Sequence, residues 1–332
     1  MNETWLMNIL FAGDVMLGRL VNQKLLRRPP EFPWGDTLPV FKEADARICN
    51  LECVISDKGR PWSATPKVFH FRSDLKNIET LKVAGIDVVS TANNHSLDYE
   101  YDALFEMLAA LEHAGVKQAG AGRNLEEAMR PAILEINGRK TAFIAFTDNE
   151  GAWEAKEHKP GVHFVPVDAG DTRAKRLFDI VAAAEKTSDI VIVSAHWGPN
   201  WGYEPVPSHV PFAHRLIESG ARIVFGHSCH VFQGVEFYRG GVIIYSAGDF
   251  VDDYAVDEVE KNDESFLFSA STNEGVRSLT LCPTVIEGFH AGMAQLPRAG
   301  LIAAKMKSLS TKFGARSEWD GEKRRLKLYP GE

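Results

Sequence analysis

Residues 221–230, ARIVFGHSCH, join a short apolar run to two histidines that stand three positions apart. A β-branched apolar run of this length is typical of a strand that is buried on both faces of a sheet. Two imidazoles at the exit of such a strand suit a metal site, whereas a pair of ordinary loop histidines is the plainer interpretation. Other parts of the sequence are needed to choose between them.

Similar apolar runs recur along the chain and alternate with amphipathic segments. The runs are NILFAGD (8–14), ARICNLE (46–52), IDVVSTANN (86–94), TAFIAFTD (141–148), DIVIVSAHWG (189–198) and GVIIYSAGD (241–249). The amphipathic segments, which we expect to be helices, are 74–85, 101–115, 173–188 and 212–220. This alternation predicts an α/β fold in which helices cover the sheets.

We expect a single domain over residues 1–332, with a core over 8–282 and a C-terminal part, 283–332, packed on it. In that part LIAAKMKSLSTKFG (301–314) is typical of an amphipathic helix, and RRLKLYP (324–330) of a final edge strand. Residues 150–172 are rich in turn formers and predict an ordered connection.

The composition restricts the class of partner and the location. The net charge is −8, which argues against a nucleic-acid partner because phosphate binding needs a basic surface. The N-terminus lacks the pattern of a signal peptide, and no segment has the apolar length of a membrane span, so we expect a cytoplasmic protein without a membrane anchor of its own. Its four cysteines form no CxxC pair and are too few for a disulfide scaffold.

Polar side chains follow the apolar runs at the point where each expected strand ends. In open α/β sheets, ligands bind outside the carboxyl ends of the strands. Carboxylates, an amide and imidazoles together suit a hard or borderline dication, and six such donors suit two metals. The six candidate ligands are Asp14, Glu52, Asn94, His196, His227 and His230.

In this order the motifs FAGDVMLGR, NLECVIS, ANNHSLDY, HWG, GHSCHVFQGVEFY and YSAGDF resemble the CapA family of poly-γ-glutamate capsule biosynthesis proteins. That family is a divergent branch of the calcineurin-like metallophosphoesterases. The resemblance implies a four-layer α/β/β/α sandwich, with two mixed sheets flanked by helices. It also implies one or two divalent ions (Mn, Fe or Zn).

The resemblance assigns a role to each candidate ligand. Asp14 and His230 would bind one metal, and Glu52 would bridge to the other. The second metal would be bound by Asn94, His196 and His227. His95 takes the place of the histidine that protonates the leaving group, and Asp98 is a candidate to orient it.

Three departures from the family pattern concern the metals. Met16 stands where the wider superfamily has a histidine ligand, and GHSCH replaces a GHHPH-like stretch. Asp249 replaces an asparagine, and its carboxylate could compensate for the missing ligand or could cap a helix. These departures leave the number and the identity of the metals open.

Several of these residues also have plainer interpretations. Glu52 could start a helix, and Asn94 could cap one, although Asn93 is the better candidate for a cap. Arg19 and Arg72 could bind an anionic substrate or be solvated surface charges. The same holds for two tryptophans, Trp197 and Trp201, which could line the pocket or pack in the core.

Two classes of function remain. The first is a metal-dependent hydrolase that acts on a phosphoester or on a γ-glutamyl or other amide bond, with a small molecule or a γ-glutamyl polymer as substrate. The second is a non-catalytic accessory factor in the synthesis or export of poly-γ-glutamate. The sequence contains no G-x-S-x-G elbow, P-loop or dinucleotide-binding motif that would favour another chemistry.

Overall fold

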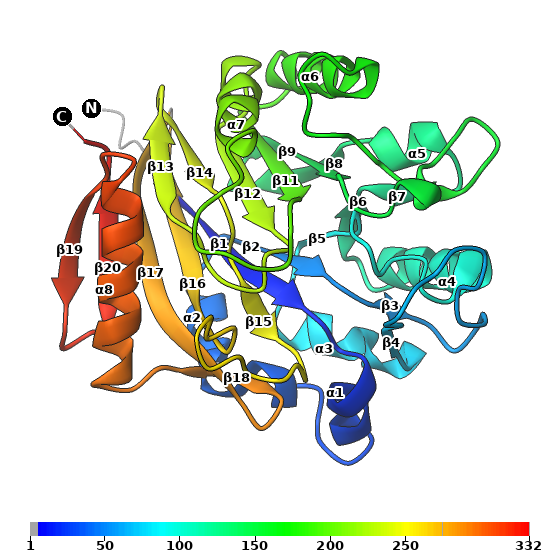
Figure 1. Ribbon diagram of the computed structural model, residues 1–332, viewed down its shortest axis with the longest axis horizontal. Helices are drawn as coiled ribbons and strands as arrows, with labels where there is room; N and C mark the ends of the chain where they lie inside the picture. Colours follow the sequence, from blue (N-terminus) through cyan, green and yellow to red (C-terminus); the bar gives the residue numbers. More distant parts are fainter. Residues whose placement is uncertain (1–5, 274, 332) are drawn as a thin grey trace.

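A computed structural model describes residues 6–273 and 275–331, and Figure 1 shows its mixed α/β fold, with two large mixed sheets and helices packed on them. The ten-stranded sheet has the order β19 (Arg316–Asp320), β20 (Arg325–Tyr329), β17 (Val276–Glu287), β16 (Glu264–Thr272), β1 (Met7–Val15), β2 (Ala46–Leu51), β5 (Val88–Ser90) and β6 (Lys117–Ala119). In the same sheet β15 (Asp249–Val251) pairs with β1, and β18 (His290–Met293) pairs with β17.

The six-stranded sheet has the order β13 (Val235–Tyr238), β14 (Gly241–Ile244), β12 (Ile223–His227), β11 (Ile190–His196), β9 (Arg139–Thr147) and β8 (Ala132–Ile136). Two short pairs complete the strands: β3 (Val54–Ile55) with β4 (Arg72–Ser73), and β7 (Ala121–Gly122) with β10 (Gly161–Val162).

The α-helices are α1 (Arg19–Leu25), α2 (Leu38–Lys42), α3 (Ile78–Val83), α4 (Glu100–His113), α5 (Leu125–Met129), α6 (Thr172–Glu185), α7 (His209–Glu218) and α8 (Arg298–Thr311). Three short 3₁₀ helices cover η1 (Phe32–Thr37), η2 (Leu75–Asn77) and η3 (Gly151–Trp153). Among the described residues, no helix is both long enough and apolar enough to cross a lipid bilayer.

Apolar side chains of the two large sheets pack against each other. Phe11 on β1 and Phe225 on β12 meet with their ring centroids 5.0 Å apart, inside one cluster that draws residues from both sheets. Alternate residues of β1 point the other way, so Leu10 joins a second cluster with Leu104 and Met107 of α4. Burying each of these large side chains stabilises the fold by about 1.5–3 kcal/mol.

Parallel pairing brings the carboxyl ends of the central strands to a common edge. β1, β2 and β5 run parallel in the large sheet, and β9, β11, β12 and β14 run parallel in the other. In this register His196 lies beside His227, and Asp14 lies beside Asn50. The predicted alternation of strands and helices is therefore confirmed, and it places the candidate ligands at strand ends.

The C-terminal region differs from the prediction in two respects. β20 is the last strand in sequence, but it lies between β17 and β19, so β19 is the edge strand. The RSEWD sequence of β19 carries mostly exposed polar residues and therefore lacks an apolar run. β17 continues through Pro283, which pairs with Phe266, so no structural break falls at the expected limit of the core.

The pKa of one buried histidine makes the stability depend on pH. The Nδ1 of His163 lies 2.9 Å from the carbonyl oxygen of Ala145, and burial lowers the pKa of His163 to about 4. In the unfolded chain, His163 binds a proton at about pH 6.5, whereas in the folded protein it stays neutral until about pH 4. The folded state therefore has its full stability, as far as His163 is concerned, above pH 6.5, and it loses stability relative to the unfolded state as the pH falls from 6.5 towards 4.

We expect the free energy of unfolding of the wild type to fall, relative to that of His163→Gln, by roughly 2–3 kcal/mol between pH 7.5 and pH 4.5. Urea unfolding of both proteins at the two pH values measures this difference. A gap between the two proteins that does not change with pH would contradict it.

Candidate functional site

The candidate site lies at the carboxyl ends of the central strands, where buried polar side chains converge from both sheets. Asp14 is the last residue but one of β1, and Glu52 directly follows β2. His196 and His227 are the last residues of β11 and β12. These four side chains are almost fully buried, with 0–1% of each residue exposed.

The first group of donors consists of Asp14, His196 and His227. Their ligand atoms lie within 4.8 Å of one another. The Nδ1 atoms of the two histidines are 2.9 Å apart, and the Nδ1 of His227 is 3.5 Å from the Oδ1 of Asp14. Burial lowers the pKa of both histidines, so both imidazoles are neutral at pH 7 and can offer a lone pair to a metal.

The second group consists of Asp14, Glu52, His230 and Asp249, and its ligand atoms also lie within 4.8 Å of one another. The Nδ1 of His230 is 3.0 Å from the Oδ1 of Asp249. Asp14 belongs to both groups, so its carboxylate is the side chain that the two sets of donors share. The resemblance gave that bridging place to Glu52, whose Oε1 is 3.9 Å from the Nε2 of His196.

The carboxylates of this centre are buried without a balancing cation. Among the described residues, the ion-pair partners of Asp14, Glu52 and Asp249 are histidines, with no Lys or Arg. Burial, together with the neighbouring carboxylates, raises the pKa of Glu52 and of Asp249 well above the usual range. Burial also raises the pKa of Asp14 to about 6.

Two carboxylate oxygens at this centre have no N–H or hydroxyl donor among the described residues. They are the Oδ2 atoms of Asp249 and of its neighbour Asp252, two carboxyl groups that can hydrogen-bond to each other only when one is protonated. Buried carboxylates without partners are costly, and a dication removes that cost by coordination. The mixed oxygen and imidazole donors therefore fit a divalent metal ion.

Asparagines support this cluster from the adjacent strand ends. The Oδ1 of Asn94 lies 2.9 Å from the Nε2 of His196, which places Asn94 with its predicted partners. Asn50 donates to the Oδ1 of Asp14 at 2.7 Å, and Asn93 donates to Asn50. The expected helix cap is not found: α4 has no side-chain cap, and Asn93 accepts instead from the backbone N–H of His95.

The backbone next to Asp14 lies in close contact with the backbone next to Asp249. A Cβ on Gly13 would lie 1.9 Å from the carbonyl oxygen of Gly248, so only glycine fits beside Asp14. Met16, at the place of the missing histidine ligand, is buried, and its sulfur accepts from the N–H of Gly18. Asp249 enters the donor group directly, so the structure favours a compensating ligand over a helix cap at this position.

His95 and Asp98 form a second polar unit beside the metal donors. The Nδ1 of His95 is 2.6 Å from the Oδ2 of Asp98, which also accepts from the N–H of Phe71 at 2.6 Å. The ring of Phe71 stacks on His95 at 3.9 Å. The structure thus brings the two predicted catalytic residues together and holds the imidazole from its Nδ1 side.

A buried lysine, which the sequence analysis did not single out, completes this unit. The Nζ of Lys67 lies 3.5 Å from Asp98 and 3.3 Å from Glu150, and donates to the carbonyl oxygen of Asn94 at 2.7 Å. Burial lowers the pKa of His95 well below its usual value, and Lys67 adds to that effect. The imidazole is therefore neutral at pH 7.

A pocket of about 650 Å³ opens beside the two groups, and His230 is the member of these groups that lines it. His95, Asn94 and His230 reach it from the polar centre, and Arg19 and Trp201 line it as expected. The complete lining is Arg19, Pro66, Lys67, Val68, Phe69, Phe71, Asn94, His95, Glu150, Asn200, Trp201, His230, Tyr254, Ala255 and Asn262.

Two expected substrate-binding residues do not line this pocket. Trp197 is buried in the core on the outer side of the six-stranded sheet, where its indole N–H donates to the carbonyl oxygen of Tyr245. Arg72 lies over the ring of Tyr99, with 4.3 Å between the guanidinium carbon and the ring centroid. The predictions that Trp197 and Arg72 line the substrate pocket are therefore wrong. The sequence does not show to which side of a strand end a side chain points.

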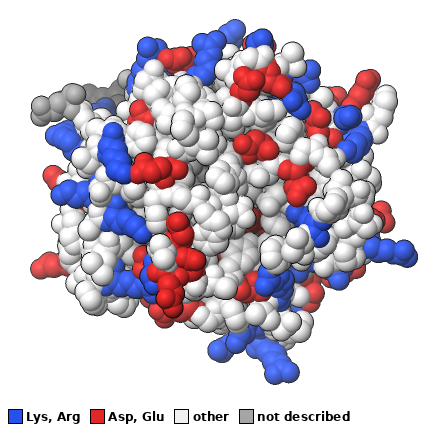
Figure 2. Space-filling model, viewed as in Figure 1, with Lys and Arg blue, Asp and Glu red and all other residues white. Residues whose placement is uncertain are grey.

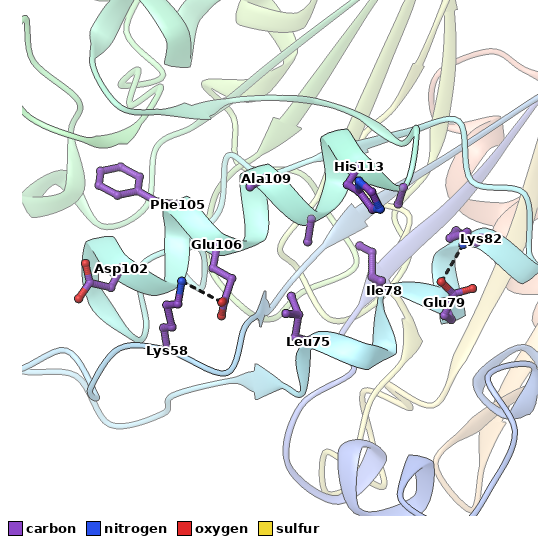
Figure 3. Close-up of a pocket in the computed structure, with 12 residues that line it drawn as sticks. Lys58, Leu75, Ile78, Glu79, Lys82, Asp102, Phe105, Glu106, Ala109 and His113 are labelled. Atoms are coloured by element: carbon purple, nitrogen blue, oxygen red, sulfur yellow. Dashed lines mark hydrogen bonds and ion pairs between the residues drawn. The ribbon is translucent and has the colours of Figure 1, made fainter.

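A second pocket, of about 610 Å³, lies elsewhere, between α3 and α4 (Figure 3). Its wall combines Leu75, Ile78 and Phe105 with ion-paired residues such as Lys58 and Glu106. This pocket contains none of the candidate metal donors, so the pocket at the strand ends is the candidate functional site.

Comparison with known proteins gives a family match over most of the chain. Residues 8–254 match the family described as bacterial capsule synthesis protein PGA_cap. The "Probable polyglutamine synthesis accessory protein" of Mycobacterium tuberculosis is 34% identical over 285 residues, which cover 74% of each chain.

Two Bacillus proteins are more distant relatives. The "PGA biosynthesis protein CapA" of Bacillus subtilis is 29% identical over 73% of this chain and 62% of its own length. The "Capsule biosynthesis protein CapA" of Bacillus anthracis is 28% identical over 74% of this chain and 60% of its own length.

A solved structure of a hypothetical protein from Thermus thermophilus covers 86% of this chain and 96% of its own, with 19% identity and a TM-score of 0.48. The family match takes in every member of both donor groups, from Asp14 to Asp249. The chain therefore belongs to the PGA_cap family of bacterial capsule synthesis proteins.

Proposed function

We propose that this protein is a metal-dependent hydrolase that acts in poly-γ-glutamate metabolism, on a phosphoester or on a γ-glutamyl or other amide bond. The observation that carries the proposal is the pair of donor groups that share Asp14, placed beside the His95–Asp98 unit at the mouth of a pocket. The family match and the name of the Bacillus subtilis relative, a PGA biosynthesis protein, support the link to poly-γ-glutamate.

We further propose that the fold is the four-layer α/β/β/α sandwich of the metallophosphoesterases. The three apolar clusters support it, since one lies between the sheets and the others lie on their outer faces. A cytoplasmic location and a small-molecule or γ-glutamyl polymer partner belong to the same proposal.

The first donor group and the second would each hold one divalent ion, with Asp14 between them. Bound ions would activate water at neutral pH and stabilise negative charge that develops on a phosphoryl or carbonyl oxygen. The chain orients these ligands: Ser194 Oγ lies 2.7 Å from the Nε2 of His227, and Asn50 holds Asp14. Such outer contacts fix ligand orientation.

His95 is placed to deliver a proton to the leaving group from its Nε2. Burial raises the pKa of Asp98 to about 7, so Asp98 can donate a proton to the Nδ1 while the neutral imidazole carries its own proton on the Nε2. The Nδ1 is engaged by Asp98, so the Nε2 is the nitrogen left to exchange a proton with a group in the pocket. Phe71 stacks on the ring and prevents it from turning, and Lys67 ties Asp98 to the backbone of Asn94. The unit is therefore held in one orientation before a substrate arrives.

A non-catalytic accessory role is the second candidate. The relative from Mycobacterium tuberculosis is named an accessory protein, and Met16 removes one ligand that the wider superfamily has. Asp249, however, adds a carboxylate to the same donor group, so the loss of that ligand does not abolish the centre.

We expect purified wild-type protein to retain one or two equivalents of Mn, Fe or Zn, measured by elemental analysis. Asp14→Ala should lose both ions, because its carboxylate belongs to both groups, while His196→Ala should lose only the ion of the first group. His214→Gln on α7, outside both groups, serves as the matched control and should keep the wild-type content. Full metal content in Asp14→Ala would contradict the assignment.

The metal-free form offers a second test of the same carboxylate. Without an ion, the buried charge of Asp14 destabilises the fold, so Asp14→Asn should raise the melting temperature of chelator-treated protein at pH 7. In metal-loaded samples the order should reverse, because the wild type gains the free energy of metal binding. Differential scanning calorimetry of both proteins in both states measures this reversal.

His95→Ala should lower kcat by about 10²–10⁴-fold while the metal content stays unchanged, since general acid catalysis contributes on this order. The assay uses metal-loaded protein with a generic phosphoester and with a γ-glutamyl peptide. Asp98→Asn should have a smaller effect, because it acts only through His95. Wild-type protein that holds its metal and hydrolyses neither substrate would favour the accessory role.

A further inference from the structure

One wall of the pocket is a continuous series of aromatic rings. Trp201 contacts His230 at 5.6 Å between centroids, and His230 contacts Tyr254 at 4.9 Å. Tyr254 contacts Phe71 at 5.6 Å, and Phe71 stacks with Phe69 at 6.3 Å. All five residues line the pocket, and we call them the aromatic wall.

The aromatic wall joins the polar centre to solvent. Its inner members belong to the site: His230 is a metal donor, and Phe71 stacks on His95. Its outer members, Phe69 and Trp201, are 59% and 44% exposed. Large aromatic side chains that stay exposed at the rim of a pocket contribute little to the core, and such surfaces commonly contact ligands.

The cations of the pocket are already paired within the protein. Arg19 lies 3.3 Å from Asp253, and Lys67 is held by Asp98 and Glu150. Figure 2 shows basic and acidic side chains interspersed over the face of the molecule that it presents, and the whole chain carries a net charge of −8. Beside an anionic group at the metal centre, the outer part of the pocket therefore offers aromatic rings as its free contact surface.

We propose that the aromatic wall binds a flat aromatic ring that is attached to the phosphoryl or acyl group held at the metal centre. This inference rests on the proposed function for the position of the anionic group. Ring-on-ring contact with Phe69 and Trp201 would select a flat substituent over a saturated one of similar size, because aromatic pairs gain from offset-stacked and edge-to-face geometry in addition to apolar burial.

Binding of three phosphonates that differ only in their substituent tests the proposal. Isothermal titration calorimetry of metal-loaded protein would compare methylphosphonate, cyclohexylphosphonate and phenylphosphonate. We expect phenylphosphonate to bind about tenfold more tightly than methylphosphonate and about threefold more tightly than cyclohexylphosphonate.

Exposed positions of the wall allow substitution without loss of the core. Phe69→Leu and Trp201→Leu should each reduce the preference for phenylphosphonate at least threefold and leave the affinity for methylphosphonate unchanged. Trp319→Leu, an exposed tryptophan on β19 at the edge of the large sheet, is the matched control and should keep the full preference.

Three results would overturn the proposal: equal affinity for the three phosphonates, no binding of any of them, or a phenyl preference that both variants retain. Hydrolysis is measured separately, so the two proposals can fail independently. A phenyl preference without turnover of any substrate would keep the aromatic wall and reject the hydrolase. Turnover of a substrate without a phenyl preference would keep the hydrolase and reject the aromatic wall as a binding site.

Discussion

The main physical constraint on this structure is a set of buried carboxylates that no Lys or Arg of the described chain neutralises. Asp14, Glu52 and Asp249 lie in nearly solvent-free surroundings, with neutral histidines as their basic neighbours. Such an arrangement costs free energy in a fold without a bound ion, and a fold selected for stability alone would not keep it. The buried carboxylates lie where the two sheets meet. At that place the strand ends of both sheets bring potential metal ligands together from separate segments of the chain.

The two sheets have different roles in building the centre. The large sheet supplies carboxylates and amides through Asp14, Asn50 and Asp249, while the other sheet supplies imidazoles through His196 and His227. Neither sheet alone carries a complete donor set for both groups. The packing of Phe11 on Phe225 therefore positions the candidate metal ligands as well as the core, because it fixes how the strand ends of the two sheets face each other.

Much of the fold and of the site could be predicted from local patterns. The apolar runs marked the parallel strands, because strands buried on both faces need continuous apolar residues. Asp14, Glu52, His196 and His227 were predicted as ligands because each follows such a run. β16 and β17 had no such signal: polar residues interrupt both strands, and Pro283 stands within β17. Lys67 was missed because it lies in a connecting segment without a motif, and only its contacts reveal it.

The amino-acid sequence by itself determined the class of the fold, the strands that end in polar residues and the membership of the family. It could do so because apolar periodicity and motif order are local properties of the chain. Only the tertiary structure decided that Asp14 is common to two donor groups, that Trp197 and Arg72 point away from the pocket, and that five rings form one wall. Those features depend on distances between residues up to about 235 positions apart in the chain, such as Asp14 and Asp249, and such distances follow from how the sheets pack.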